Sequence, residues 1–179
     1  MVFKFITLSD EVDDFMREIY IDASATFLDL QNALLDSVGY TKDQMTSFVL
    51  CDNEWNKETE ITLVEMESAS DVDLYVMEKT PLEELLDEED QRMLFIFDYM
   101  TDRCFFLELN AIIHKETIKQ AKCSKSIGAP PPQTIDFEEQ ATPKSSSLMF
   151  DEEFYGDSDY DLDELDDEGY TSLDSLEDY

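Results

Sequence analysis

Hydrophobic and polar residues alternate along the first 120 residues in patterns that predict a folded domain. Six runs rich in β-branched and aromatic residues predict strands, at residues 2–8, 15–21, 47–51, 61–66, 92–99 and 103–109. The acidic loop 9–14 joins the first two runs, and the short turn 100–102 joins the last two. We therefore expect a hairpin at each end of the domain.

Between the hairpins, Phe27, Leu30, Leu34 and Val38 recur at spacings of three and four, the stripe of an amphipathic helix. Ser24 or Thr26 can accept the free N–H groups at its start, and Gly39 can take the left-handed conformation after its end.

Thr80-Pro81-Leu82-Glu83 predicts the start of a second, short helix, with Thr80 as cap, Pro81 in the first turn and Glu83 reaching back. The order of elements predicts an α+β fold. A hairpin that leads into a helix packed across a mixed sheet is the β-grasp (ubiquitin-like) pattern, and we expect it here by analogy of topology.

Composition changes near residue 122. Residues 1–125 hold 28 acidic and 11 basic side chains, whereas residues 126–179 hold 17 acidic side chains and only Lys144 as a base. Prolines 130–132 and serines 145–147 are typical of a linker, and the acidic block after them repels itself. We expect a domain at 1–121, a Pro/Ser linker at 122–147 and a disordered acidic-aromatic tail at 148–179.

The chain as a whole carries 45 acidic and 12 basic residues, a formal charge of −33. Direct nucleic-acid binding is disfavoured, because it depends largely on Lys and Arg at the phosphates, and an anionic membrane surface would repel the chain. No apolar run is long enough to span a membrane, and the start lacks a signal peptide's apolar region. We expect a cytoplasmic protein.

Catalytic motifs are missing from the sequence. His114 is the only histidine, the four glycines are isolated, and Cys51, Cys104 and Cys123 form no C-x-x-C pair. We therefore expect no enzyme, no cofactor and no metal site. Carboxylates are so abundant that a pair of them has no diagnostic value, although a metal-dependent carboxylate enzyme stays an alternative.

One segment of the tail imitates a calcium-binding loop. Residues 157–168 place acidic side chains at positions 1, 3, 5, 7 and 12 of a twelve-residue loop. Leu162 stands where the sharp turn needs glycine, and Glu164 stands where a hydrophobic residue anchors such loops. We expect weak binding of divalent cations at most.

Aromatic residues among the acids favour a tail that folds on a partner over a merely solubilising tail. In the domain, Trp55 lies in the polar loop Asn53–Lys57 and is a candidate for an exposed contact. The candidate partner-binding residues are Trp55, Phe150, Phe154, Tyr155, Tyr160 and Tyr170.

Two segments resemble a known family. Residues 25–40 are similar to the helix segment of the root-inducing-plasmid (pRiA) ORF-3-like family, and residues 93–109 resemble its hairpin "YDFGDxWxHxI". Cys123, Gly128 and the prolines 130–132 stand where that family tends to carry a Cys, a Gly and a Pro pair. The resemblance covers about residues 1–133 and implies a plasmid- or transposon-associated protein.

The chain also departs from the family pattern. Asp98 and Asp102 match the two aspartates of the hairpin, but Met100 replaces its glycine, Cys104 its tryptophan and Phe106 its histidine. If the family builds a polar site from those positions, this chain has lost it.

Together these features predict a non-enzymatic protein-interaction module whose acidic tail binds a basic protein partner. The alternative is a mobile-element accessory protein that mimics the charge of DNA or sequesters a basic DNA-binding protein.

Overall fold

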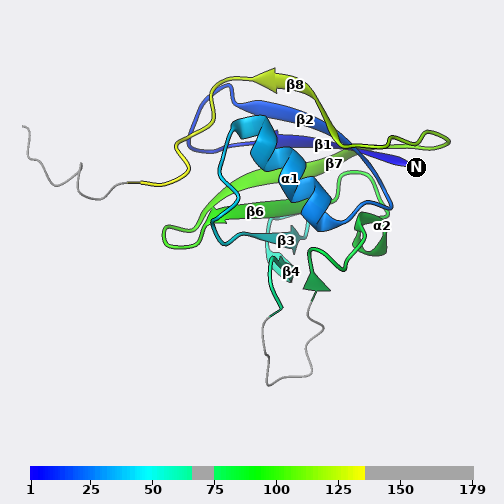
Figure 1. Ribbon diagram of the computed structural model, residues 1–179, viewed down its shortest axis with the longest axis horizontal. Coiled ribbons are helices and arrows are strands. Elements are labelled where there is room, and N and C mark those ends of the chain that lie inside the picture. Colours follow the sequence, from blue (N-terminus) through cyan, green and yellow to red (C-terminus); the bar gives the residue numbers. More distant parts are fainter. Residues whose placement is uncertain (66–74, 136–179) are drawn as a thin grey trace, which may run out of the picture. The chain divides into compact units, whose positions relative to one another are not determined.

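The computed structural model describes residues 1–65 and 75–135 of the chain (Figure 1). In this part it contains eight strands and two helices: β1 Val2–Leu8, β2 Met16–Asp22, α1 Phe27–Val38, β3 Ser47–Cys51, β4 Lys57–Thr62, β5 Tyr75–Val76, α2 Leu82–Leu85, β6 Arg92–Asp98, β7 Arg103–Ile113 and β8 Lys122–Ile127.

The strands form one mixed sheet in the order β5-β4-β3-β6-β7-β1-β2-β8. Its pairs are antiparallel except β4 with β5, which is parallel. The two predicted hairpins, β1–β2 and β6–β7, are confirmed and meet at the β1–β7 pair near the middle of the sheet. The α+β prediction holds at this level: a mixed sheet with few helices.

Helix α1 has the predicted start and end. Thr26 and Asp29 form a reciprocal capping box, in which each side chain accepts the other residue's backbone N–H. Gly39 ends the helix with a φ of 72°, which a glycine adopts without steric cost. Each terminus therefore satisfies its free backbone groups locally.

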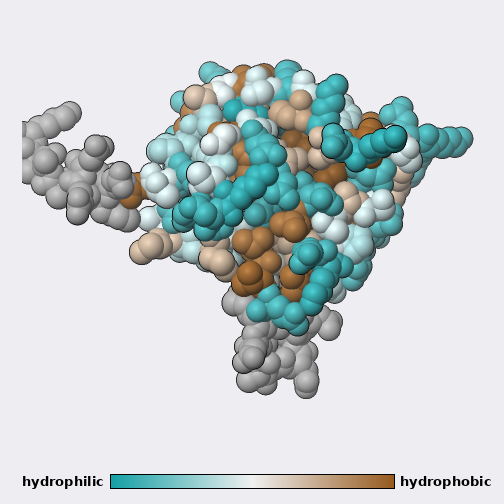
Figure 2. Space-filling view, viewed as in Figure 1, coloured by the Kyte–Doolittle hydropathy of each residue, from teal (hydrophilic) through white to brown (hydrophobic). Residues whose placement is uncertain are grey.

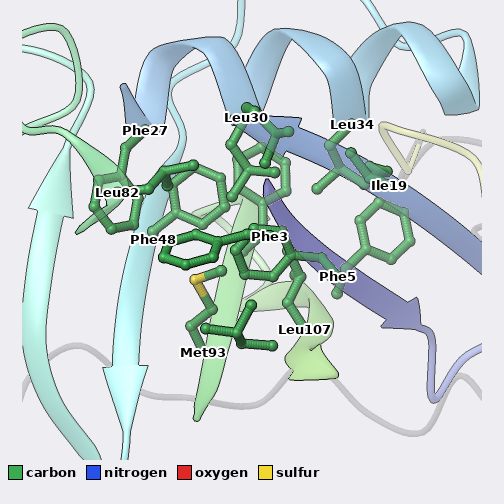
Figure 3. Packing of buried hydrophobic residues seen from close by; sticks show 14 of the residues in the cluster. Phe3, Phe5, Ile19, Phe27, Leu30, Leu34, Phe48, Leu82, Met93 and Leu107 are labelled. Carbon is green, nitrogen blue, oxygen red and sulfur yellow. The ribbon is translucent and has the colours of Figure 1, made fainter. Parts of the chain in front are cut away.

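The core lies between α1 and one face of the sheet, called the helix face below (Figure 3). Phe27, Leu30 and Leu34 of α1 point onto this face, where Phe3, Phe5, Ile19, Phe48, Met93 and Leu107 meet them. Leu82 and Leu86, in and just after α2, are buried in the same cluster. Burial of an apolar side chain contributes about 1.5–3 kcal/mol, so this cluster is the main source of stability.

The start of α2 differs by one residue from the prediction. Pro81 is the N-cap, and no side chain caps the helix. The Thr80 hydroxyl instead donates to the Val76 carbonyl, and the Glu83 N–H donates to the carbonyl of Ala23. The helix start is thus satisfied by neighbouring segments, which a local pattern does not reveal.

Two strands have bounds that differ from the predictions by more than one residue, and a further, short strand was not predicted. Strand β4 occupies 57–62 instead of 61–66, because the turn before it closes within residues 52–56. Strand β7 continues beyond Leu109 to Ile113 after a bulge opposite Lys4 and Phe5. The short strand β5 was not predicted.

The largest correction concerns the start of the expected linker. Residues 122–127 form strand β8, which pairs with β2. Its sequence, KCSKSI, has little hydrophobic alternation, so its strand state comes from pairing with a neighbour.

Two buried arginines fix the chain after β8. The guanidinium of Arg17, 3% exposed, donates to the carbonyls of Ile127 and Gly128. Arg103, 7% exposed, forms a bidentate ion pair with Glu11 and donates to the carbonyls of Pro132 and Gln133. Charged donors make the stronger hydrogen bonds, so residues 127–133 belong to the domain.

Candidate partner-binding surfaces

The loop that carries Trp55 is a tight turn between β3 and β4, built by Asp52. The Asp52 carboxylate accepts hydrogen bonds from the backbone N–H groups of Glu54 and Asn56 and from the Asn56 side chain. These bonds, that of the Asn56 side chain above all, hold the pKa of Asp52 below its ordinary value. The turn places Trp55 at a φ of 66°, a left-handed conformation that is costly for a bulky residue.

This conformation brings the Trp55 ring back over the sheet, on the face opposite α1, called the open face below. There Trp55 packs against a small apolar cluster of Val49, Cys51, Leu94 and Ile96. Its ring meets Phe106 edge to face at 5.0 Å, and the Arg92 guanidinium lies 5.2 Å from the Trp55 ring centre. Trp55 is therefore half-buried, more enclosed than its polar loop predicts.

Two of the three positions that depart from the family hairpin, Cys104 and Phe106, come together at this cluster. Cys104 and Phe106 both contact it from β7. Burial raises the pKa of Cys104 to about 11 and also raises the pKa of Cys51, so both thiols are protonated at neutral pH. Asp98 lies at the end of β6, 3.9 Å from Arg103, and Met100 in the turn is 88% exposed. Where the family hairpin has glycine, tryptophan and histidine, this chain thus presents Met100, Cys104 and Phe106.

A second surface lies on the other side of the molecule. A groove of about 450 Å³ runs between the outer side of α1 and the connection from β7 to β8. Ile21, Ala25 and Ala33 give it an apolar floor, and Asp22, Asp29 and Asp36 supply carboxylates. Figure 2, in the same view as Figure 1, shows hydrophilic surface along α1 next to exposed apolar atoms.

The carboxylates of this groove differ in their present partners. Asp22 accepts from the Ser24 hydroxyl and N–H, and these bonds lower the pKa of Asp22. Asp29 is engaged in the capping box, and Asp36 forms an exposed ion pair with Lys42 at 2.8 Å. Exposed pairs of this kind contribute little, so Asp36 can exchange Lys42 for another cation.

Within residues 1–65 and 75–135, no group of three or more His, Cys, Asp or Glu side chains is placed to hold a metal ion. His114 is exposed in the turn after β7. The tail candidates Phe150, Phe154, Tyr155, Tyr160 and Tyr170, like the calcium-type loop 157–168, lie outside the described residues. No helix in the described part of the chain is long and apolar enough to cross a membrane.

Two arginines and a tyrosine were missed by the sequence analysis. Arg17, Arg103 and Tyr40 all hold the segment after β8, Tyr40 through a bond of 2.5 Å from its hydroxyl to the Pro131 carbonyl. Burial raises the pKa of Tyr40 to about 12. The sequence did contain a signal for the two arginines. The acidic chain has only three arginines, and an arginine inside an apolar strand is usually buried with a defined partner.

The mixed sheet with helices on one face defines an α+β domain. The chain matches the family described as plasmid pRiA4b ORF-3-like protein over residues 2–143. It belongs to that family, as the resemblance implied. The match continues beyond the expected domain end at residue 121, in agreement with the place of β8 in the sheet.

The fold also resembles a solved structure. The crystal structure of a protein of unknown function from Methanosarcina mazei Go1 superposes with a TM-score of 0.54 at 17% identity, over 70% of this chain and 68% of that chain. At this identity the likeness concerns the fold alone. No curated protein matches the sequence.

Proposed function

We propose that this protein is a non-enzymatic interaction module that binds a basic protein partner. The observation that carries the proposal is the groove beside α1, which joins an apolar floor to a rim of carboxylates. The described residues hold 25 acidic and 11 basic side chains, so the field around the groove is negative and attracts cations.

The groove suits a long basic side chain. A lysine or arginine can lay its aliphatic stem on Ala25 and Ala33 while its charged head meets Asp36 or Asp29. Lys119 is the one base that lines the groove, and it can swing away on a flexible stem. The volume lies within the range of about 300–1,000 Å³ found for ligand pockets.

The acidic tail would add its own contacts with the same partner. Its 14 carboxylates between residues 151 and 179 supply long-range attraction, and its aromatic residues supply anchors. We propose Phe150, Phe154, Tyr155, Tyr160 and Tyr170 as those anchors. Trp55, the candidate partner-binding residue of the domain, lies on the open face of the sheet, away from the groove, and is a candidate for a separate protein contact there.

The family narrows the class of partner. Its name refers to a plasmid, which favours the form of the proposal in which the basic partner is itself a DNA-binding protein. Binding to the acidic surface would then compete with DNA through mimicry of its charge. We propose no catalytic step and no cofactor, and a cytoplasmic location.

The finer fold assignment is also a proposal. The hairpin β1–β2 leads directly into α1, which packs on the sheet, and this order supports a β-grasp-like unit within the larger sheet.

The test measures binding of a fluorescent lysine-rich peptide to the full chain at low salt. Asp36→Lys alters the groove, and Asp87→Lys makes the same charge change at an exposed site outside it. Both variants weaken long-range attraction equally, so any difference between them reports the groove. We expect Asp36→Lys to weaken binding about tenfold more than Asp87→Lys.

The affinity of a shortened chain that ends at residue 143, where the family match ends, shows how much the tail contributes to peptide binding. Equal affinities of the two lysine variants would contradict the role of the groove. Unchanged binding by the shortened chain would contradict the role of the tail. If a basic protein binds to the chain, DNA is then added as a competitor. Displacement of the chain by DNA supports charge mimicry, and a complex that persists in DNA supports docking at a separate surface.

A further inference from the structure

The open face of the sheet has no helix over it in the described part of the chain. Buried side chains of α1 and α2 belong to the cluster on the helix face. The open face carries a separate, smaller cluster around Val49 and Leu94. Antiparallel sheets commonly turn one polar face to water, so the composition of this face decides whether it needs a partner.

The strand register shows a row of apolar side chains across this face. Each member lies directly opposite the next on the neighbouring strand, and directly opposed residues share a face. From β3 to β8 the row consists of Val49, Leu94, Phe106, Leu8, Met16 and Ile127.

The row is buried at its β3 end and more exposed from β1 to β8. Val49 and Leu94 are 4% and 7% exposed, because Trp55 and Phe106 pack over that end. Farther along the row, Leu8 on β1 is 48% exposed and Ile127 on β8 is 39% exposed. Six opposed apolar residues across six strands make a contiguous patch, and such patches on soluble domains mark interaction sites.

Charge on the open face is balanced, unlike that of the rest of the molecule. The register places five bases on it, and the same register with the bulged Glu58 gives five acids. These are Lys4, Lys57, Arg92, Lys122 and Lys125, against Glu18, Asp22, Glu58, Glu60 and Glu108. The remaining described residues hold 20 acidic and six basic side chains.

We propose that the open face is the dimer interface of this protein, and that its occupant is a second copy of the same chain. Two copies with a charge of −33 each repel one another on most approaches. The open face is where they meet without net repulsion, since acids and bases on it match those of a twofold-related copy. A highly basic or highly acidic partner would find no such match there.

The arrangement is a face-to-face packing of two sheets. Inner faces of packed sheets lie about 10 Å apart, with strand directions within about 30° of each other. The apolar rows would meet at the centre, with Trp55 and Phe106 as aromatic anchors and the charged residues as rim. The groove beside α1, on the other side of the sheet, stays free for the basic partner.

The test is the molar mass of the full chain in solution, by sedimentation equilibrium over a range of concentrations. We expect a dimer of twice the 20.8 kDa chain mass. Leu8→Glu puts a carboxylate in the centre of the interface and should weaken dimerisation about 30-fold or more. Val64→Glu is the matched control, since Val64 is also 48% exposed but lies outside the row.

Ile127→Glu, at the exposed end of the row, repeats the test on another strand in case Leu8→Glu fails to fold. Dimers of the wild type and of Val64→Glu, with monomers of the two row variants, support the proposal. A wild-type monomer at all concentrations overturns it, whatever else the face binds. Equal dissociation of row and control variants, or a dimer of folded Leu8→Glu and Ile127→Glu, also overturns it.

Discussion

Trp55 illustrates how a single backbone conformation decides the character of a site. A left-handed conformation at a bulky residue costs on the order of 1–3 kcal/mol, and here the Asp52 hydrogen bonds and the packing against Phe106 offset it. From the sequence, Trp55 is simply an aromatic residue in a polar loop. Its return over the sheet depends on the turn, which the residue pattern does not reveal.

Cys104 offers a test of how enclosed the apolar cluster is. Burial raises its pKa to about 11, and the thiolate is the reactive form, so alkylation in the folded protein should be slow at pH 8. We expect iodoacetamide to modify Cys104 on the order of 100-fold more slowly than in urea. Peptide mapping by mass spectrometry follows each cysteine separately.

The urea-unfolded chain is the internal reference for that experiment, because its thiols have ordinary pKa values. A rate for folded Cys104 close to the unfolded rate would show that water reaches the thiol and that the cluster opens. Raising the pH toward 11 should accelerate the reaction of the folded protein, in line with the raised pKa.

At the scale of elements, the sequence predicts well wherever periodicity and capping agree. Strands β1 and β3 and helix α1 have the predicted bounds, because alternation, a capping residue and Gly39 all point the same way. Strands β5 and β8 were not predicted, because they form by pairing with β4 and β2 and not from a local pattern of their own. The groove beside α1 was likewise not predictable, because it joins α1 to residues 118–121, more than 80 positions later.

Two glycines allow a matched test of the segment after β8. Both Gly39 and Gly128 have positive φ, but an added Cβ meets nothing within 4 Å at Gly39 and lies 2.7 Å from the Asp14 carbonyl oxygen at Gly128. Gly39→Ala should cost about 1 kcal/mol, from the left-handed conformation alone. Gly128→Ala should cost about 3 kcal/mol or more, because backbone must also move.

Urea denaturation followed by circular dichroism measures both free energies of unfolding. Equal losses for the two variants would mean that residues 127–133 separate from the domain without cost. That result would restore the linker prediction for the whole of 122–147. A larger loss for Gly128→Ala supports a domain that includes this segment.

At the scale of the molecule, charge in the described part of the chain is distributed unevenly. Outside the open face these residues hold 20 acidic and six basic side chains, whereas the open face is balanced, so salt should act on the proposed contacts in opposite directions. Screening weakens attraction to a basic partner and relieves repulsion between two acidic copies. Screening also reduces the repulsion between like charges within one chain, which is stronger in the compact folded state than in the expanded unfolded state.

We therefore expect that salt between about 0.05 and 1 M, where the Debye length shrinks from more than 10 Å to about 3 Å, raises the melting temperature. Over the same range the dimer should tighten and the lysine-rich peptide should bind more weakly. Differential scanning calorimetry, sedimentation and fluorescence anisotropy supply the three measurements. Salt-independent peptide affinity would refute electrostatic recognition, and a falling melting temperature would refute self-repulsion.

The central pairing of β1 with β7 also has a consequence for folding. Val2 lies opposite Ile113, so the middle of the sheet closes only when the two ends of the domain come together. Such distant pairing slows folding, since the entropy of a long loop is lost before the contact forms. At about 5–20 residues per second, a ribosome exposes β1 for several seconds or more before β7 emerges. During that interval the β1–β2 hairpin can form with α1 around Phe3 and Phe5, and β3 can pair with β4 and β6. The opposite edge of β1 stays unpaired until β7 emerges.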